Sequence, residues 1–168
     1  MSDILRDAEE VDLPRIVEIY NSSIPGRLAT ADTAPVTIEN RLAWFREHNP
    51  TTHPLWVLER AGQIIAWISL SKFYGRPAYR ATAEVSLYVA PEHQGEGIGP
   101  RLLRAMIARC PEFGIETLLG FVFAHNEPSM KMNRQVGFEQ WGYLPEVAEL
   151  DGEKRDLIIV GLKVGKQS

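Results

Sequence analysis

The sequence predicts one α/β domain in which helices flank a mixed β-sheet. The length of 168 residues corresponds to one domain at roughly 150 residues per domain, so residues 1–168 are assigned to a single unit. Hydrophobic residues make up 45% and charged residues 24%, an ordinary globular composition. Short β-rich runs are interspersed with segments whose apolar residues recur at helical spacing, which is typical of a layered α/β domain.

The first half of the chain predicts a strand, two helices and a β-hairpin. A short strand is expected at residues 2–6. Asp12, followed by Leu13-Pro14, is typical of a helix start with Asp12 as the cap. The segment Pro25–Val36 predicts a loop long enough to be a functional lid, and Thr37 can cap a second helix. Two β-rich runs then predict a hairpin: Pro54–Arg60 and Gln63–Leu70, joined by Ala61-Gly62.

The second half predicts four strands and two helices. A continuous apolar run indicates a strand buried on both faces, and Gly137 is placed to end the last helix. The expected elements are strand Thr82–Val89, helix Arg101–Arg109, strand Glu116–Ala124, helix Asn126–Val136, and two closing strands, Phe138–Leu150 and Arg155–Val164, around Asp151-Gly152.

Composition and charge argue against several classes of protein. The formal net charge of −4 argues against a nucleic-acid binder, which normally shows a basic excess. The single cysteine, Cys110, cannot close a disulfide within the chain. No apolar run is long enough for a membrane span, and the N-terminus lacks the profile of a signal peptide, so a cytoplasmic protein is expected. The four histidines show no metal-binding spacing, so no metal is expected.

A glycine-rich segment between the strand ending at Val89 and the following helix is the most informative motif. Gln94-Gly95-Glu96-Gly97-Ile98-Gly99-Pro100 lets the backbone approach a ligand, and the helix start favours an anion, so a phosphate or pyrophosphate site is expected. A Walker loop would need Gly-Lys-Ser/Thr, and a dinucleotide fingerprint would need glycine where Pro100 stands. A glycine turn without a ligand is the alternative.

Two motifs in order give the chain a family resemblance. The Gln94-x-x-Gly97-x-Gly99 loop resembles the acetyl-CoA loop of the GNAT acyltransferase superfamily. Asn126-Glu127-Pro128-Ser129, then Gly137-Phe138, resembles the signature around the last helix of the same superfamily. Arg76-Pro77-Ala78-Tyr79-Arg80-Ala81-Thr82-Ala83-Glu84 looks like the phosphinothricin and methionine sulfoximine N-acetyltransferase branch. The resemblance covers nearly the whole chain.

The resemblance implies a sheet split between its fourth and fifth strands, acetyl-CoA as cosubstrate and a homodimer. It further implies transfer of acetyl to the amine of a small amino acid or analogue. The cofactor would contact Leu87, Tyr88 and Val89 through the backbone, the loop Gln94, Gly95, Glu96, Gly97, Ile98, Gly99 and Pro100, and the side chains of Asn126, Ser129 and Asn133. Asn126 also suits a helix N-cap, a role compatible with cofactor contact.

Glu84 is the candidate general base. Strand alternation places Glu84, Ser86 and Tyr88 on one face of an otherwise apolar strand. Burial of a carboxylate raises its pKa and makes it a better base. The alternative is a structural ion pair with Arg76 or Arg80.

The connection before this strand carries the expected substrate-binding residues, which are Lys72, Phe73, Arg76 and Arg80, together with Glu84 itself. A free amino acid brings its own carboxylate, and arginine binds carboxylates in a bidentate manner. Solvated arginines are the alternative.

Asn133 departs from the family pattern, in which Tyr or His often stands at this position. An amide cannot act as a general acid near neutral pH, so proton delivery to the leaving thiolate is in doubt. This departure keeps open a CoA-binding module with weak or no catalysis. Polyamine or protein N-terminal acetylation is the other alternative for the function.

Overall fold

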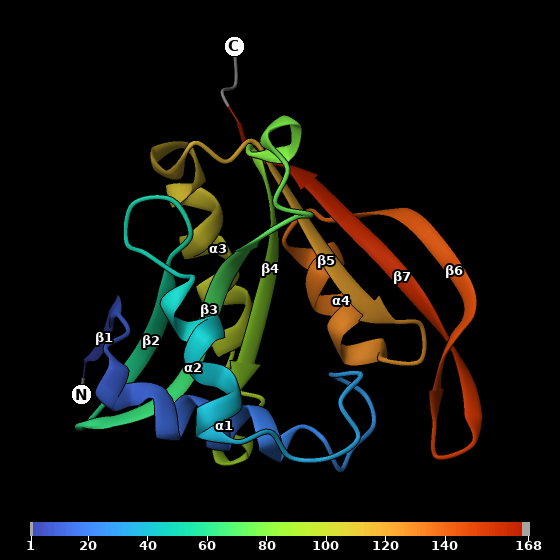
Figure 1. Cartoon of the computed structure of the whole chain (residues 1–168), viewed down its shortest axis with the longest axis horizontal. Coiled ribbons are helices and arrows are strands. Elements are labelled where there is room, and N and C mark those ends of the chain that lie inside the picture. Colours follow the sequence, from blue (N-terminus) through green and yellow to red (C-terminus); the bar gives the residue numbers. More distant parts are fainter. Residues whose placement is uncertain (1, 166–168) are drawn as a thin grey trace.

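Seven strands form one mixed sheet in the order β1-β2-β3-β4-β5-β7-β6, and four α-helices flank it (Figure 1). The computed structural model describes residues 2–165. The strands are β1 (Asp3–Asp7), β2 (Leu55–Arg60), β3 (Gln63–Lys72), β4 (Thr82–Val89), β5 (Thr117–Phe123), β6 (Glu139–Leu150) and β7 (Glu153–Lys163). The helices are α1 (Leu13–Ser22), α2 (Ile38–Arg46), α3 (Ile98–Arg109) and α4 (Glu127–Gln135). The predicted fold class is confirmed.

Turn residues define the two hairpins as expected. Ala61 and Gly62 both have positive φ, 52° and 79°, between the antiparallel strands β2 and β3. Asp151 and Gly152 repeat this conformation, 53° and 80°, between β6 and β7. Two successive residues with positive φ match the right-handed twist of the flanking strands, so each pair closes a tight hairpin.

Helix ends are partly as predicted. The Thr37 side chain accepts a hydrogen bond from the Asn40 backbone and caps α2. Asp12 does not cap α1, contrary to prediction; its carboxylate accepts from the Glu9 backbone and pairs with Arg6, because a 3-10 turn precedes the helix. α3 begins at Ile98, three residues earlier than predicted.

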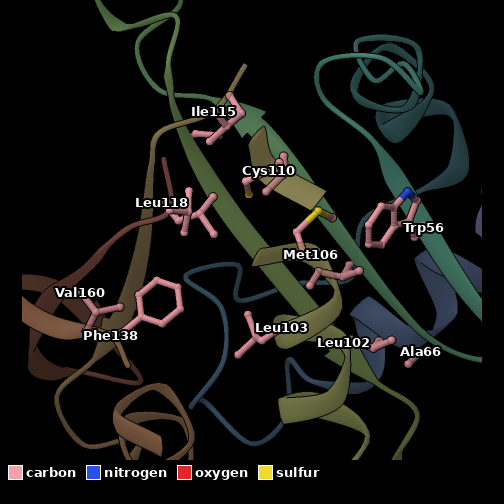
Figure 2. Packing of buried hydrophobic residues seen from close by; sticks show 14 of the residues in the cluster. Trp56, Ala66, Leu102, Leu103, Met106, Cys110, Ile115, Leu118, Phe138 and Val160 are labelled. Atoms are coloured by element: carbon pink, nitrogen blue, oxygen red, sulfur yellow. The ribbon is translucent and has the colours of Figure 1, made fainter. Parts of the chain in front are cut away.

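Two apolar clusters cover opposite faces of the sheet. α3 and α4 pack on one face, where Leu102, Leu103 and Met106 join residues from β2 to β5 and β7, as the close view in Figure 2 shows. α1 packs on the other face, where Ile16 and Ile19 of this helix meet residues of β2 and β3. Cys110 is fully buried in the first cluster, and burial raises the pKa of its thiol to about 12, so it packs as an apolar residue.

The sheet opens between β4 and β5, the only parallel pair in the described structure. Only three register pairs join these strands, and the last is Glu84 with Leu119. Beyond it β4 continues to Val89 beside β3, and β5 continues to Phe123 beside β7. The two strands diverge along this length in Figure 1. The predicted split is confirmed, and it leaves one edge of β4 without a partner strand over five residues.

Candidate active site

A cavity of about 730 Å³ opens where β4 and β5 separate. β4 and β5 supply two of its walls, α4 a third, and the loop after α1 closes it. Its charged lining residues are Arg41 and Glu84, so the wall holds one cation and one carboxylate. The wall includes Tyr20, Leu28, Ala29, Arg41, Trp44, Trp67, Ser71, Glu84, Ser86, Leu87, Tyr88, Asn126, Ser129 and Asn133.

Glu84 is half-buried in the cavity wall, and burial raises the pKa of its carboxyl group. Within residues 2–165 the structure shows no ion pair between Glu84 and Arg76 or Arg80, the alternative role considered from the sequence. Tyr88 packs on the α1 face and Leu87 on the α3 face, so the predicted alternation along β4 is confirmed. The geometry therefore leaves this carboxylate free to accept a proton.

The backbone groups of Leu87 and Val89 point to the unpaired edge of β4. Those of Tyr88, contrary to prediction, point to Trp67 of β3, because the hydrogen-bonded pair of Ala90 with Ile65 sets the alternation of the antiparallel ladder. An extended ligand can add to such an edge as a further strand through main-chain hydrogen bonds. The Val89 carbonyl accepts a hydrogen bond from the Gln94 side chain at 3.4 Å, which links the strand to the glycine loop. Val89 and the loop 94–100 do not line the main cavity, so this hydrogen bond places the loop at the end of the unpaired edge and outside the cavity wall.

The glycine loop has the backbone conformation that its sequence predicts. Gly95 and Gly97 have φ of 82° and 78°, and Gly97 occupies the N-cap position of α3. A Cβ on Gly99 would lie 2.7 Å from the Met132 sulfur, so this glycine permits α3 and α4 to approach closely. Ile98 is buried in the core and anchors the loop, and Pro100 lies in the first turn of α3.

Ion pairs join the glycine loop to Arg60, at the end of β2. Arg60 donates to Glu96 at 2.8 Å, and His93 contacts the other oxygen of Glu96 at 3.2 Å. Asp3 binds both Arg60 and Arg101, and these contacts hold the pKa of the Asp3 carboxyl well below its usual range. Glu96 is therefore directed toward Arg60 and not toward an incoming anion.

The side-chain amides of Asn126 and Asn133 both bond to the first turn of α4, and Asn126 also bonds to the loop after α1. The Asn126 side chain accepts from the Ser129 backbone at 3.2 Å, which confirms the N-cap role, and it donates to the Leu28 carbonyl at 3.2 Å. Asn133 donates to the Ser129 carbonyl at 2.7 Å, and its own side-chain oxygen has no protein partner among the described residues. Asn126, Ser129 and Asn133 all line the cavity. The amide of Asn133 brings to it no group that could donate a proton to a thiolate.

Lys72, Phe73, Arg76 and Arg80 line a second cavity of about 190 Å³, together with His53 and Thr82. No residue lines both cavities. The structure therefore does not bring these four residues into the main cavity with Glu84, and their contact with a substrate stays a prediction.

Sequence reasoning named the loop 25–36 as a lid but missed the contacts that close it over the main cavity. The Tyr88 hydroxyl donates to the Ala29 carbonyl at 3.1 Å, and Tyr20 bonds to Thr30 and Asp32, so the loop 25–36 is fixed over β4. Arg41 lies 4.5 Å above the centre of the Tyr20 ring. In the sequence only the length of this loop indicated that it could act as a lid. Its contact with Tyr88 could not be predicted, because the two segments lie far apart along the chain.

Within residues 2–165, no helix is long and apolar enough to cross a membrane, and no group of three or more His, Cys, Asp or Glu residues could hold a metal ion.

An unpaired strand edge that is followed by a glycine loop at a helix start and adjoins a half-buried carboxylate is suited to moving an acyl group onto a nucleophile. Fold and cavity together define an acyltransferase. The chain belongs to the acetyltransferase (GNAT) family, whose model matches residues 13–138.

Relatives support this assignment over nearly the full length. YwnH of Bacillus subtilis, provisionally assigned as a phosphinothricin acetyltransferase, is 48% identical over 94% of this chain and 96% of its own. The L-methionine sulfoximine/L-methionine sulfone acetyltransferase of Pseudomonas aeruginosa is 32% identical over 98% and 96%. A GNAT phosphinothricin acetyltransferase from Sinorhizobium meliloti, crystallised with acetyl-CoA, superposes with a TM-score of 0.91 at 29% identity, covering 100% of this chain and 91% of its own.

Proposed function

We propose that this enzyme transfers acetyl from acetyl-CoA to the amine of a small amino acid or analogue of the phosphinothricin and methionine sulfoximine type. The observation that carries the proposal is Glu84, the one carboxylate in the described wall of the main cavity, half-buried and unpaired where the β4 edge becomes free. The substrates named for the relatives support this acceptor class. An acetyl-CoA complex of a structural neighbour supports the cosubstrate.

The residues of β4 and its loop fit acetyl-CoA. The backbone of Leu87 and Val89 can pair with the pantetheine arm, and the loop 94–100 can hold the pyrophosphate. Glu84 takes one proton from the acceptor ammonium, directly or through water, and the neutral amine then attacks the thioester carbonyl. The second amine proton is released after attack. A thiol has a pKa of about 8.5, so the thiolate can leave without an acid at Asn133.

Arg76 and Arg80 are our proposed ligands for the acceptor carboxylate, with Lys72 and Phe73 beside them. Their pocket carries three cations and no carboxylate, which supports an anionic ligand. In one chain this pocket is separate from Glu84. Recognition of the acceptor there requires the connection 71–81 to rearrange or to reach the main cavity of a second subunit.

A homodimer is part of the proposal. Phe121, Trp141 and Leu144 are exposed on β5 and β6. The strand register places Phe121 and Leu144 on the same face of the sheet as Glu84. Exposed apolar side chains therefore lie on the face of the sheet that also carries the main cavity. Leu144→Glu should shift a dimer toward monomer in light scattering, with the far-ultraviolet circular dichroism unchanged. A monomeric unsubstituted protein would contradict the dimer.

A cytoplasmic location stays a prediction.

A panel of acceptors tests the function. Release of CoA thiol should require acetyl-CoA and an amino acid such as methionine sulfoximine or phosphinothricin. Preference for a polyamine or for a peptide N-terminus would move the acceptor to that class. Tight acetyl-CoA binding without transfer to any amine would indicate a binding module.

A further inference from the structure

Ser71 faces Glu84 across the β3–β4 pair. The two residues are register partners in these antiparallel strands, and both line the main cavity. Side chains of partner residues lie on the same face with Cβ atoms about 5 Å apart. A hydroxyl and a carboxylate therefore adjoin each other at the point where the amine must be deprotonated.

His48 determines how the Ser71 hydroxyl is oriented. The His48 Nδ1 lies 2.8 Å from the Trp44 carbonyl, and a carbonyl only accepts, so Nδ1 carries the hydrogen. In the neutral ring Nε2 is then an acceptor. It lies 3.4 Å from the Ser71 oxygen, which donates its proton to it. Burial lowers the pKa of His48, which favours this neutral form.

With its proton directed to His48, the Ser71 oxygen presents only lone pairs to the cavity. We propose that Ser71, oriented by His48, accepts a hydrogen bond from the acceptor's amino group beside the Glu84 carboxylate. This inference rests on the proposed function and adds a specificity-determining residue to it. A primary ammonium has three N–H donors; Glu84 accepts one and Ser71 another. After proton transfer to Glu84, the bond to Ser71 keeps the amine in place for attack.

Ser69 provides a matched control on the same strand and face. It is fully buried, its hydroxyl has no partner among the described residues, and it does not line the cavity. Ser71→Ala should raise the acceptor KM about tenfold or more, the effect of losing a hydrogen bond to a charged group. The KM for acetyl-CoA should stay unchanged. Ser69→Ala should leave both values unchanged, and Ser71→Thr, which keeps the hydroxyl, should restore most of the acceptor affinity.

A double-mutant cycle tests the positioning role of His48. His48→Phe keeps a ring against Trp44 but removes the acceptor at Nε2, so the acceptor KM should rise, by less than in Ser71→Ala. In the Ser71→Ala background, His48→Phe should add no further change, because the hydroxyl it orients is gone. Equal effects of His48→Phe in both backgrounds would show a merely structural role and overturn the positioning.

The outcomes separate this inference from the proposed function. Normal acetyl transfer by the unsubstituted protein with an unchanged acceptor KM in Ser71→Ala would overturn the inference alone. Absence of transfer to any amine by the unsubstituted protein would overturn the function and the inference with it.

Discussion

The two cavities of this protein differ in origin and in charge. The main cavity exists because β4 and β5 stop pairing after Glu84, so its position follows from the sheet topology. The two charged residues of its wall, Arg41 and Glu84, have opposite signs, so their formal charges cancel. The second cavity lies beside the connection between β3 and β4, and its charged residues are Lys72, Arg76 and Arg80.

The differences in origin and charge suit the two cavities to two different kinds of ligand. A gap in main-chain pairing offers unpaired backbone groups, which suit an extended cofactor whatever the neighbouring side chains are. A cationic surface pocket offers side chains only, and these select an anionic group. Variants in each cavity should therefore affect different kinetic constants.

The largest effect is expected at the glycine loop 94–100, which follows β4. Gly97→Asp should lower the affinity for acetyl-CoA by about a hundredfold or more, because a carboxylate opposes the pyrophosphate. The fold should persist: nothing lies within 4 Å of a Cβ at Gly97, and aspartate tolerates its positive φ better than most residues. Calorimetric titration with acetyl-CoA measures the change.

Gly97→Asn separates charge from size at the same position. Asparagine has the shape of aspartate without its charge, so it should weaken binding much less. Unchanged affinity in Gly97→Asp would show that the loop does not hold the pyrophosphate.

Glu84→Gln should reduce kcat by about a hundredfold, the usual scale for removing a general base, with little change in the KM for acetyl-CoA. The pKa of Glu84 is raised by burial, so in the unsubstituted enzyme kcat/KM should fall as the pH drops through this value. In the variant that acidic limb should flatten. A near-normal rate with the same limb would show that the amine enters already neutral.

Arg76→Ala tests the second cavity. Arg76 is exposed in this structure, so the prediction requires that the bound acceptor cover its guanidinium. In that case kcat/KM for an amino acid should fall roughly thirtyfold, since losing a charge pair that binding has buried costs about 2–5 kcal/mol. The loss should be much smaller for the corresponding decarboxylated amine. Equal losses for the two acceptors would exclude carboxylate recognition and favour a polyamine. Arg80→Ala, one turn further along the connection, should show the same pattern more weakly.

The smallest effect concerns stability. Because the native pKa of Glu84 is raised, the folded state binds more protons than the unfolded state between the two pKa values, and stability falls as the pH rises through them. Glu84→Gln lacks this loss. The variant should therefore melt at a higher temperature than the unsubstituted protein at pH 7, with the difference decreasing toward pH 4. A constant difference would point to packing and not to ionisation.

Local patterns predicted the strands well, whereas the closing of the cavity depends on distant residues. The bounds of β4, Thr82–Val89, followed from alternation between turn-forming segments, which is information within the segment itself. The anchoring of Leu28 by Asn126 joins residues 98 positions apart, and no local pattern encodes it. The separation of Arg76 from Glu84 was missed for the same reason, because eight residues along the chain do not say which cavity a side chain enters.

The split in the sheet also creates a hazard, because an unpaired strand edge is a template on which another chain can add a strand and begin to aggregate. The loop 25–36 crosses this edge, held by Tyr88 at Ala29, by Asn126 at Leu28 and by the ion pair of Arg27 with Asp151. Held by these contacts, the loop obstructs the approach of a strand from another chain. The same loop that closes the cavity therefore also shields the unpaired edge of β4 from strand-to-strand aggregation.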